Sequence, residues 1–200
     1  MITNPSEKDE IYLANVEKIG NSTENIQYVE DVLSKEDHAV LLNYVKNADS
    51  WKEQPWLARM IESENLPKEV FEILNKTFEL VYKKSTDLYD VAINPFHKSA
   101  LHLVKFVVGF YLVPHVDTLS SEGNHIASVY YINDDYTGGE IDFPDHNLKI
   151  KPKANSLIIF PGNENYLHAV HKIVNNDRYS SAMWFQFTGS TFNKKAEWYN

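Results

Sequence analysis

The stretch LHLVKFVVGFYLVPHVD (101–117) contains two β-type segments and ends in a histidine and an aspartate two positions apart. Apolar and β-branched residues dominate both segments and Gly109 separates them, a pattern typical of consecutive strands. On a strand, residues i and i+2 project to the same side, so His115 and Asp117 can face one partner together. The spacing alone leaves two interpretations open, a metal-binding pair or two polar residues in a turn.

The residues that follow repeat this pattern of short β segments separated by turns. Gly, Asn and Asp gather in the breaks, as in NDDYTGG (133–139) and NNDR (175–178). The expected strands are 101–108, 109–117, 126–133, 139–144, 147–152, 156–161, 168–174 and 180–187. About eight short strands at this spacing indicate a sandwich, a barrel or a jelly roll.

The sequence before residue 95 favours helices, after a strand within 25–33. Segment 34–48 opens on Ser34 with an acidic residue three places later, a pattern similar to a capping box. Segment 66–89 places Pro67 in a favourable first-turn position. The expected apolar stripes are Ala39, Leu42 and Val45 in the first helix, and Phe71, Leu74, Phe78 and Val81 in the second. We expect both stripes to pack against a sheet.

These elements predict an α+β chain that is mainly β. The core would be a double-stranded β-helix, or jelly roll, over about 100–188, with the two helices buttressing one face. The length fits one domain, which we place at 25–200, with residues 1–24 as a peripheral N-terminal extension.

Composition excludes several classes of function. The 200 residues contain no cysteine, which rules out thiolate catalysis, zinc–thiolate sites and disulfides. The formal net charge of −9 works against a nucleic-acid partner, because such binding needs lysine and arginine to neutralise phosphates. Apolar runs such as 106–113 are shorter than the about 20 residues of a membrane span. No secretory signal is visible, so we expect no membrane partner and a cytoplasmic location.

A third metal ligand would have to come from a distant strand, and YLHAVHKIVNNDRYSSAMWF (166–185) offers two histidines. Iron(II) oxygenases hold the metal with two imidazoles and one carboxylate and leave the opposite positions open. On a strand His168 and His171 point to opposite faces; we favour His168 and keep His171 as the rival. Arg178 stands ten residues after His168, and its planar guanidinium can hold a carboxylate with two hydrogen bonds.

The order and spacing of these segments resemble the Fe(II)/2-oxoglutarate-dependent dioxygenases, and within them the prolyl 4-hydroxylase-like family. Besides the two long stretches already quoted, the matching segments are IQYVEDVLSKEDHAVLLNYV (26–45), YYIND (130–134), GGEIDF (138–143) and KPKANSLIIF (151–160). The resemblance covers roughly 25–188. It implies hydroxylation of a C–H bond with Fe(II), 2-oxoglutarate and O₂, giving succinate and CO₂, with ascorbate as a candidate reductant.

The resemblance also assigns a role to seven residues. They are the iron ligands and catalytic residues His115, Asp117 and His168, the 2-oxoglutarate-binding Arg178 and Tyr131, and the pocket-lining Phe106 and Trp184. Arg178 and Tyr131 would both contact the distal carboxylate of 2-oxoglutarate. Many relatives carry tyrosine where Phe106 stands, so a hydrogen bond to the cosubstrate is missing there. We expect His125 and His146 to be surface residues, and His97 and His102 to be structural.

By the same resemblance the substrate would be a prolyl residue in a peptide or protein. One alternative keeps the chemistry but changes the substrate to another residue or a free amino acid. An alternative from another class is a metal-binding jelly-roll module without oxygenase activity. A zinc hydrolase would need a general base beside the ligands, and the sequence shows no obvious one. A nucleic-acid demethylase would need a basic groove and a second arginine shortly after Arg178, and neither is present. Segments 50–65 and 118–126 are expected to shape specificity, the former as a mobile lid or as a loop between helices.

Overall fold

The computed structural model of the chain describes residues 23–55, 58–89, 101–117 and 125–186. The helices are α2 (Lys35–Asn47) and α3 (Lys68–Tyr89), with 3₁₀ turns at Thr23–Asn25, Ser63–Asn65, Pro144–His146 and Glu164–Tyr166. The strands are β1 (Gln27–Val29), β2 (Lys52–Gln54), β3 (Ala58–Glu62), β4 (His102–Phe106), β5 (Leu112–His115), β6 (His125–Tyr131), β7 (Ile141–Phe143), β8 (Leu148–Ile150), β9 (Ser156–Pro161), β10 (His168–Val170) and β11 (Arg178–Gln186). Each of the eight strands expected after residue 100 has a counterpart, several of them shorter than expected.

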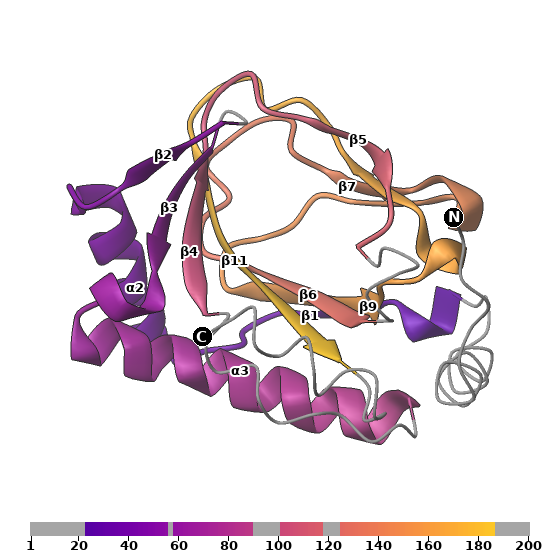
Figure 1. Ribbon diagram of the computed structural model, residues 1–200, viewed down its shortest axis with the longest axis horizontal. Coiled ribbons are helices and arrows are strands. Elements are labelled where there is room, and N and C mark those ends of the chain that lie inside the picture. Colours follow the sequence, from indigo (N-terminus) through magenta and orange to yellow (C-terminus); the bar gives the residue numbers. More distant parts are fainter. Residues whose placement is uncertain (1–22, 56–57, 90–100, 118–124, 187–200) are drawn as a thin grey trace, which may run out of the picture.

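The strands form two antiparallel sheets that face each other. The larger sheet has the order β1-β9-β6-β11-β4-β3-β2 and the smaller sheet the order β5-β10-β7-β8. Figure 1 shows the smaller sheet above the larger one and both helices against the outer face of the larger sheet. The predicted α+β jelly roll with buttressing helices is therefore confirmed.

The helix α3 attaches to the sheet through the apolar stripe expected from its sequence. Leu74, Phe78 and Val81 are buried, and the Phe78 ring lies 4.9 Å from that of Phe185 on β11. Aromatic pairs at this separation contribute beyond the area that they bury. The outer face of β11 is thus fixed against α3, and its alternate residues must face the smaller sheet.

The helix α2 begins as predicted, but its buried face differs in part from the expected stripe. The Ser34 Oγ accepts a hydrogen bond from the Asp37 backbone N–H at 3.1 Å, which caps the helix. Leu41 and Val45 are its buried residues, whereas Ala39, expected in the stripe, is exposed. The larger Leu41 side chain buries more apolar area than alanine can, and this decides the rotation of the helix.

The segment 50–65, expected to be a lid or a connecting loop, forms the edge of the larger sheet instead. Strands β2 and β3 pair as a hairpin, and β3 pairs with β4 from Ala58 to Glu62. Backbone groups of β4 would otherwise lack partners on this side, and the hairpin satisfies them. Trp51 packs its ring 5.8 Å from that of Tyr179. Trp56 and residues 118–124 lie outside the described part of the chain.

One histidine expectation changes with the fold, because His146 is half-buried and its Nε2 hydrogen-bonds the Asn165 carbonyl oxygen at 2.8 Å. His125 is the first residue of β6, and its expected exposure stays a prediction. His97 lies outside the described residues. Within the described residues, neither helix has the length and apolar character that crossing a bilayer requires.

Candidate active site

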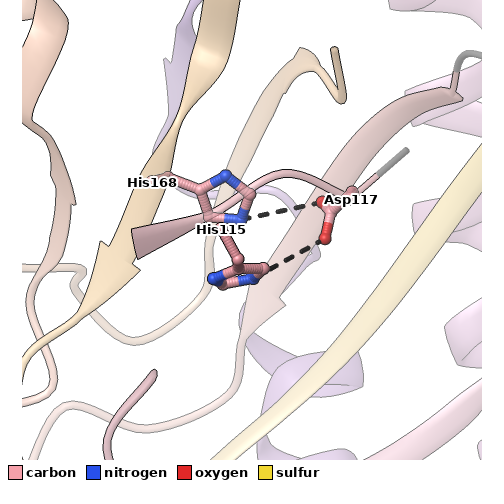
Figure 2. A group of neighbouring side chains, drawn as sticks. All are labelled: His115, Asp117 and His168. Carbon is pink, nitrogen blue, oxygen red and sulfur yellow. Dashed lines mark ion pairs between the residues drawn. The ribbon is translucent and has the colours of Figure 1, made fainter. Parts of the chain in front are cut away.

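Three side chains meet between the two sheets: His115, Asp117 and His168. The atoms that each could offer to a metal ion all lie within 4.8 Å of one another. The Asp117 carboxylate faces both imidazoles, with its Oδ1 3.9 Å from His115 Nε2 and its Oδ2 3.7 Å from His168 Nε2 (Figure 2). Two ligands of one ion at about 2.1 Å can be at most about 4.2 Å apart, so the group needs little adjustment to hold a metal.

Neighbouring strands of the smaller sheet bring these residues together. His115 on β5 is paired directly with His168 on β10, and the register shifts between His168 and Val170. His171, the rival ligand, lies outside the group and hydrogen-bonds Asp142 Oδ2 through its Nε2 at 2.9 Å. The parity of the strand thus separates the two histidines as the sequence predicts.

Each imidazole has one nitrogen engaged and the other directed at the carboxylate. The Nδ1 of His115 donates to the Val113 carbonyl oxygen at 2.8 Å, and that of His168 to the Tyr166 carbonyl oxygen at 3.0 Å. Such bonds fix the tautomer and leave the Nε2 lone pairs for a metal. Burial lowers the pKa of His168, which favours the neutral form that a metal requires.

A second polar group lies on the same side of the larger sheet, around Arg178 at the start of β11. Arg178 is 3% exposed as a residue, and its guanidinium stacks over two rings, with its central carbon 4.7 Å from the Phe106 centroid and 5.5 Å from that of Tyr131. One terminal nitrogen, Nη1, donates to the Gly139 carbonyl oxygen at 3.2 Å. The Nε has no hydrogen-bond partner although it is buried.

Arg178 is a buried cation without a counter-ion among the described residues. The ion pairs between described residues include none with Arg178, and the adjacent Asp177 pairs instead with Lys105 at 3.0 Å. A buried charge is costly unless it is paired. A ligand carboxylate would supply both the charge and the missing acceptor, so the residues present fit a dicarboxylic cosubstrate.

Tyr131 is a protonated hydrogen-bond donor at physiological pH. Burial raises the pKa of Tyr131 to about 12, although the nearby Arg178 acts in the opposite direction. Its position on β6, opposite Ser180 of β11, places it beside the arginine. The expected pair of Arg178 and Tyr131 therefore lies on one face of the sheet, together with Phe106.

Trp184 lies farther along the same face of β11. It pairs with Ala127, whose other neighbour across the sheet is Phe160, and the Phe160 ring lies 4.7 Å from that of His168. The half-buried indole stacks on His102 with ring centroids 6.0 Å apart. Trp184 thus lies at the level of the three clustered residues and not beside Arg178.

Ser180 is a site residue that the sequence analysis missed. It follows Arg178 by two positions and so faces the same side of β11, and its buried Oγ has no hydrogen-bond partner. Parity relative to Arg178 could have suggested it. The missing partner, however, is a property of the folded chain alone.

The family model of the 2OG-Fe(II) oxygenase superfamily matches residues 101–186, which run from the residue before β4 to the end of β11. Over this segment, which is less than half of the chain, the sequence is similar to that superfamily. The match and the group of His115, Asp117 and His168 make the chain a 2-oxoglutarate-dependent dioxygenase that uses Fe(II) and O₂. The matched segment contains the three clustered residues and Arg178, so the family and the geometry point to the same region.

Solved structures support the oxygenase fold at low sequence identity. A viral collagen prolyl hydroxylase of Paramecium bursaria Chlorella virus-1, in a 2-oxoglutarate complex, has a TM-score of 0.63 at 17% identity, covering 84% of this chain and 99% of that one. A Trichoplax adhaerens prolyl hydroxylase, in complex with a peptide fragment of the hypoxia inducible factor oxygen degradation domain, gives 0.68 at 14%, covering 95% and 92%. A Pseudomonas putida prolyl-4-hydroxylase gives 0.63 at 16%, covering 88% and 98%. No curated protein matches the sequence significantly.

Proposed function

We propose that His115, Asp117 and His168 hold the Fe(II) of this oxygenase. Two imidazoles and one carboxylate within 4.8 Å of one another form the donor set that Fe(II) oxygenases use. With Fe(II), 2-oxoglutarate and O₂ bound, such a site supplies the oxidation of a C–H bond to C–OH, while 2-oxoglutarate becomes succinate and CO₂.

We further propose that Arg178 and Tyr131 bind the distal carboxylate of 2-oxoglutarate. The observation that carries this assignment is the buried guanidinium, which has no counter-ion in the described part of the chain. Arg178 would hold the carboxylate through its charge and through directed N–H hydrogen bonds. The protonated Tyr131 would donate a further hydrogen bond to the same carboxylate. Phe106 would form the apolar floor under the guanidinium and keep water from it.

The rings around His168 would protect the metal side of the pocket. Phe143 lies with its ring 5.7 Å from that imidazole, and Phe160 lies at 4.7 Å. Trp184 would form the wall of the pocket at this level. An apolar surround excludes bulk water and leaves the approach of the substrate as the main route to the open side of the site.

For the substrate, we propose a prolyl residue in a peptide or protein. The support is the likeness in fold to three proteins described as prolyl hydroxylases, one of them bound to a peptide. The alternative is the same oxidation of another residue or of a free amino acid, because a fold does not fix the substrate. A cytoplasmic location, absence of a nucleic-acid partner and one domain over 25–200 remain predictions.

The experiment is to measure succinate formed from 2-oxoglutarate by protein loaded with Fe(II) without oxygen and then exposed to O₂. It is run with a proline-rich peptide, with the same peptide carrying alanine for each proline, and with no peptide. We expect turnover to rise only with the first peptide, which should gain the mass of one oxygen atom. His168→Ala should abolish turnover, and His171→Ala, the matched control, should preserve it.

Turnover that no peptide stimulates would keep the oxygenase and reject the prolyl substrate. Equal stimulation by both peptides would mean that the hydroxylated residue is not proline. If His168→Ala turned over 2-oxoglutarate as fast as the unmodified protein, the proposed ligand set would be wrong.

A further inference from the structure

Tyr136 carries a buried hydroxyl that the fold leaves without a partner. It lies in the turn between β6 and β7, it is 2% exposed, and its Oη makes no hydrogen bond with any residue that the structure describes. Leaving a buried hydroxyl unpaired is costly in free energy, and each such group in a native protein needs an explanation.

The ring of Tyr136 is held firmly beside the cosubstrate pocket. It packs against Gly139, where an added Cβ would approach the ring carbon Cε2 to 2.8 Å, and the Lys151 ammonium lies 3.7 Å from its centroid. It also belongs to the same buried cluster as Phe106, the residue under the guanidinium. The ring therefore has little freedom to turn its hydroxyl elsewhere.

Gly139 connects this ring to Arg178. Its α-carbon faces Tyr136, and its carbonyl oxygen accepts the hydrogen bond from Nη1 of the arginine. The Arg178 charge and the Tyr131 hydroxyl both act electrostatically on the phenol of Tyr136. The Oη of Tyr136 and the Nε of Arg178 are both buried without a hydrogen-bond partner among the described residues, and Gly139 adjoins both side chains.

The phenol of Tyr136 is a donor at physiological pH. Burial raises its pKa above the usual value, and the opposing effect of Arg178 is smaller. An acceptor is therefore required, and the part of the chain that the structure describes provides none. A carboxylate bound at Arg178 would bring lone pairs for the phenol as well as charge for the guanidinium.

We propose that Tyr136 is a further 2-oxoglutarate-binding residue, which donates a hydrogen bond to the distal carboxylate beside Arg178 and Tyr131. This inference rests on the proposed cosubstrate site. It provides a second tyrosine hydroxyl in a pocket where Phe106 offers none.

The test is the affinity of two keto acids for Tyr136→Phe and for the unmodified protein, measured by titration calorimetry without oxygen and with Mn(II) in place of iron. The first is 2-oxoglutarate, and the second is 2-oxopentanoate, which has a methyl group in place of the distal carboxylate. We expect Tyr136→Phe to bind 2-oxoglutarate about tenfold more weakly, the effect of one hydrogen bond to a charged group. Its affinity for 2-oxopentanoate should be unchanged.

Tyr130→Phe is the matched control. Its hydroxyl lies on the other face of β6 and donates to Asn155 Oδ1 at 2.9 Å, so its loss should lower the melting temperature without changing the affinity for 2-oxoglutarate. Tyr136→Phe should lower the affinity for 2-oxoglutarate without lowering the melting temperature. The hydroxyl that it removes has no hydrogen-bond partner among the described residues of the free protein.

Equal affinity of Tyr136→Phe and the unmodified protein for 2-oxoglutarate would overturn the role of Tyr136 and leave the proposed function intact. Equal weakening for both keto acids would show that Tyr136 supports the pocket only structurally, and would also overturn the inference. If the unmodified protein bound 2-oxoglutarate no better than Arg178→Ala does, the cosubstrate site itself would be wrong and the inference would fail with it.

Discussion

At the scale of single residues, His168 and His171 differ in environment although three positions separate them. His168 is buried beside Asp117 and has a free Nε2, whereas the Nε2 of His171 is hydrogen-bonded to Asp142 on the other side of the strand. Only the first can direct a lone pair into the space between the sheets.

Alanine substitutions of His168 and His171 should therefore differ clearly in their effect on metal binding. We expect His168→Ala to weaken Mn(II) binding by more than about 100-fold, because loss of a group that only supports a ligand already costs 10–100-fold. His171→Ala should change it by less than about twofold. Equilibrium dialysis or calorimetry of the two variants measures this, and similar losses in both would contradict the assignment of His168.

Arg178 should cost stability in the free protein, because it is a buried and unpaired charge. We expect Arg178→Leu to raise the free energy of unfolding of the metal-free protein by about 1 kcal/mol or more, while 2-oxoglutarate affinity falls by more than about 100-fold. Urea unfolding and calorimetry give the two values. A variant that loses both stability and affinity would mean that Arg178 is structural.

At the scale of elements, the turn from β6 to β7 determines how the arginine is held. Gly138 has φ +74°, and a Cβ there would collide with the backbone carbonyl oxygen of Lys172. The next residue, Gly139, has φ +69° and offers its carbonyl to Arg178. This turn, and not β11 alone, fixes the guanidinium.

We expect Gly138→Ala to lower the free energy of unfolding by about 2–4 kcal/mol, through both the positive φ and the collision with backbone. Gly109→Ala is the control, since φ there is +97° but no atom lies within 4 Å of the added Cβ. Gly109→Ala should lower the free energy of unfolding by less, through backbone conformation alone. Equal losses by urea unfolding would show that the contact with Lys172 is relieved at little cost.

The sequence predicts the strands after residue 100 well, because alternation and turn residues agree there. The prediction fails for 50–65, because Pro55 and the charged Lys52 and Glu53 are typical of a loop. The strand β3 forms there through its pairing with β4, which lies far away in the sequence. The parity that separates His168 from His171 is also readable from sequence. Ser180 and Tyr136 are different, because an unpaired hydroxyl exists only once its surroundings are assembled.

At the scale of the whole molecule, buried tyrosines link stability to alkaline pH. Burial raises the pKa of Tyr131 to about 12 and raises those of Tyr130 and Tyr136 as well. In the unfolded chain tyrosine loses its proton near pH 10. Between these values the unfolded chain binds fewer protons than the native one, so stability is complete below pH 10 and is lost as the pH rises toward 12.

We expect the free energy of unfolding to fall steeply between pH 10 and 11.5. Each fully protected tyrosine contributes a slope of up to about 1.4 kcal/mol per pH unit. Tyr131→Phe should have a shallower slope by up to that amount. Urea unfolding at several pH values checks this, and a slope that Tyr131→Phe leaves unchanged would mean that this phenol ionises freely in the native state.

The smaller sheet ends at β5, which carries His115 and is followed at once by Asp117. Among the described residues β5 pairs with β10 alone, whereas β10 also pairs with β7. An edge strand with one neighbour opens at a lower free energy than an internal strand. Fraying of this one strand would withdraw two of the three proposed ligands together. The lifetime of the bound metal should then follow hydrogen exchange of the β5 amides and not global unfolding.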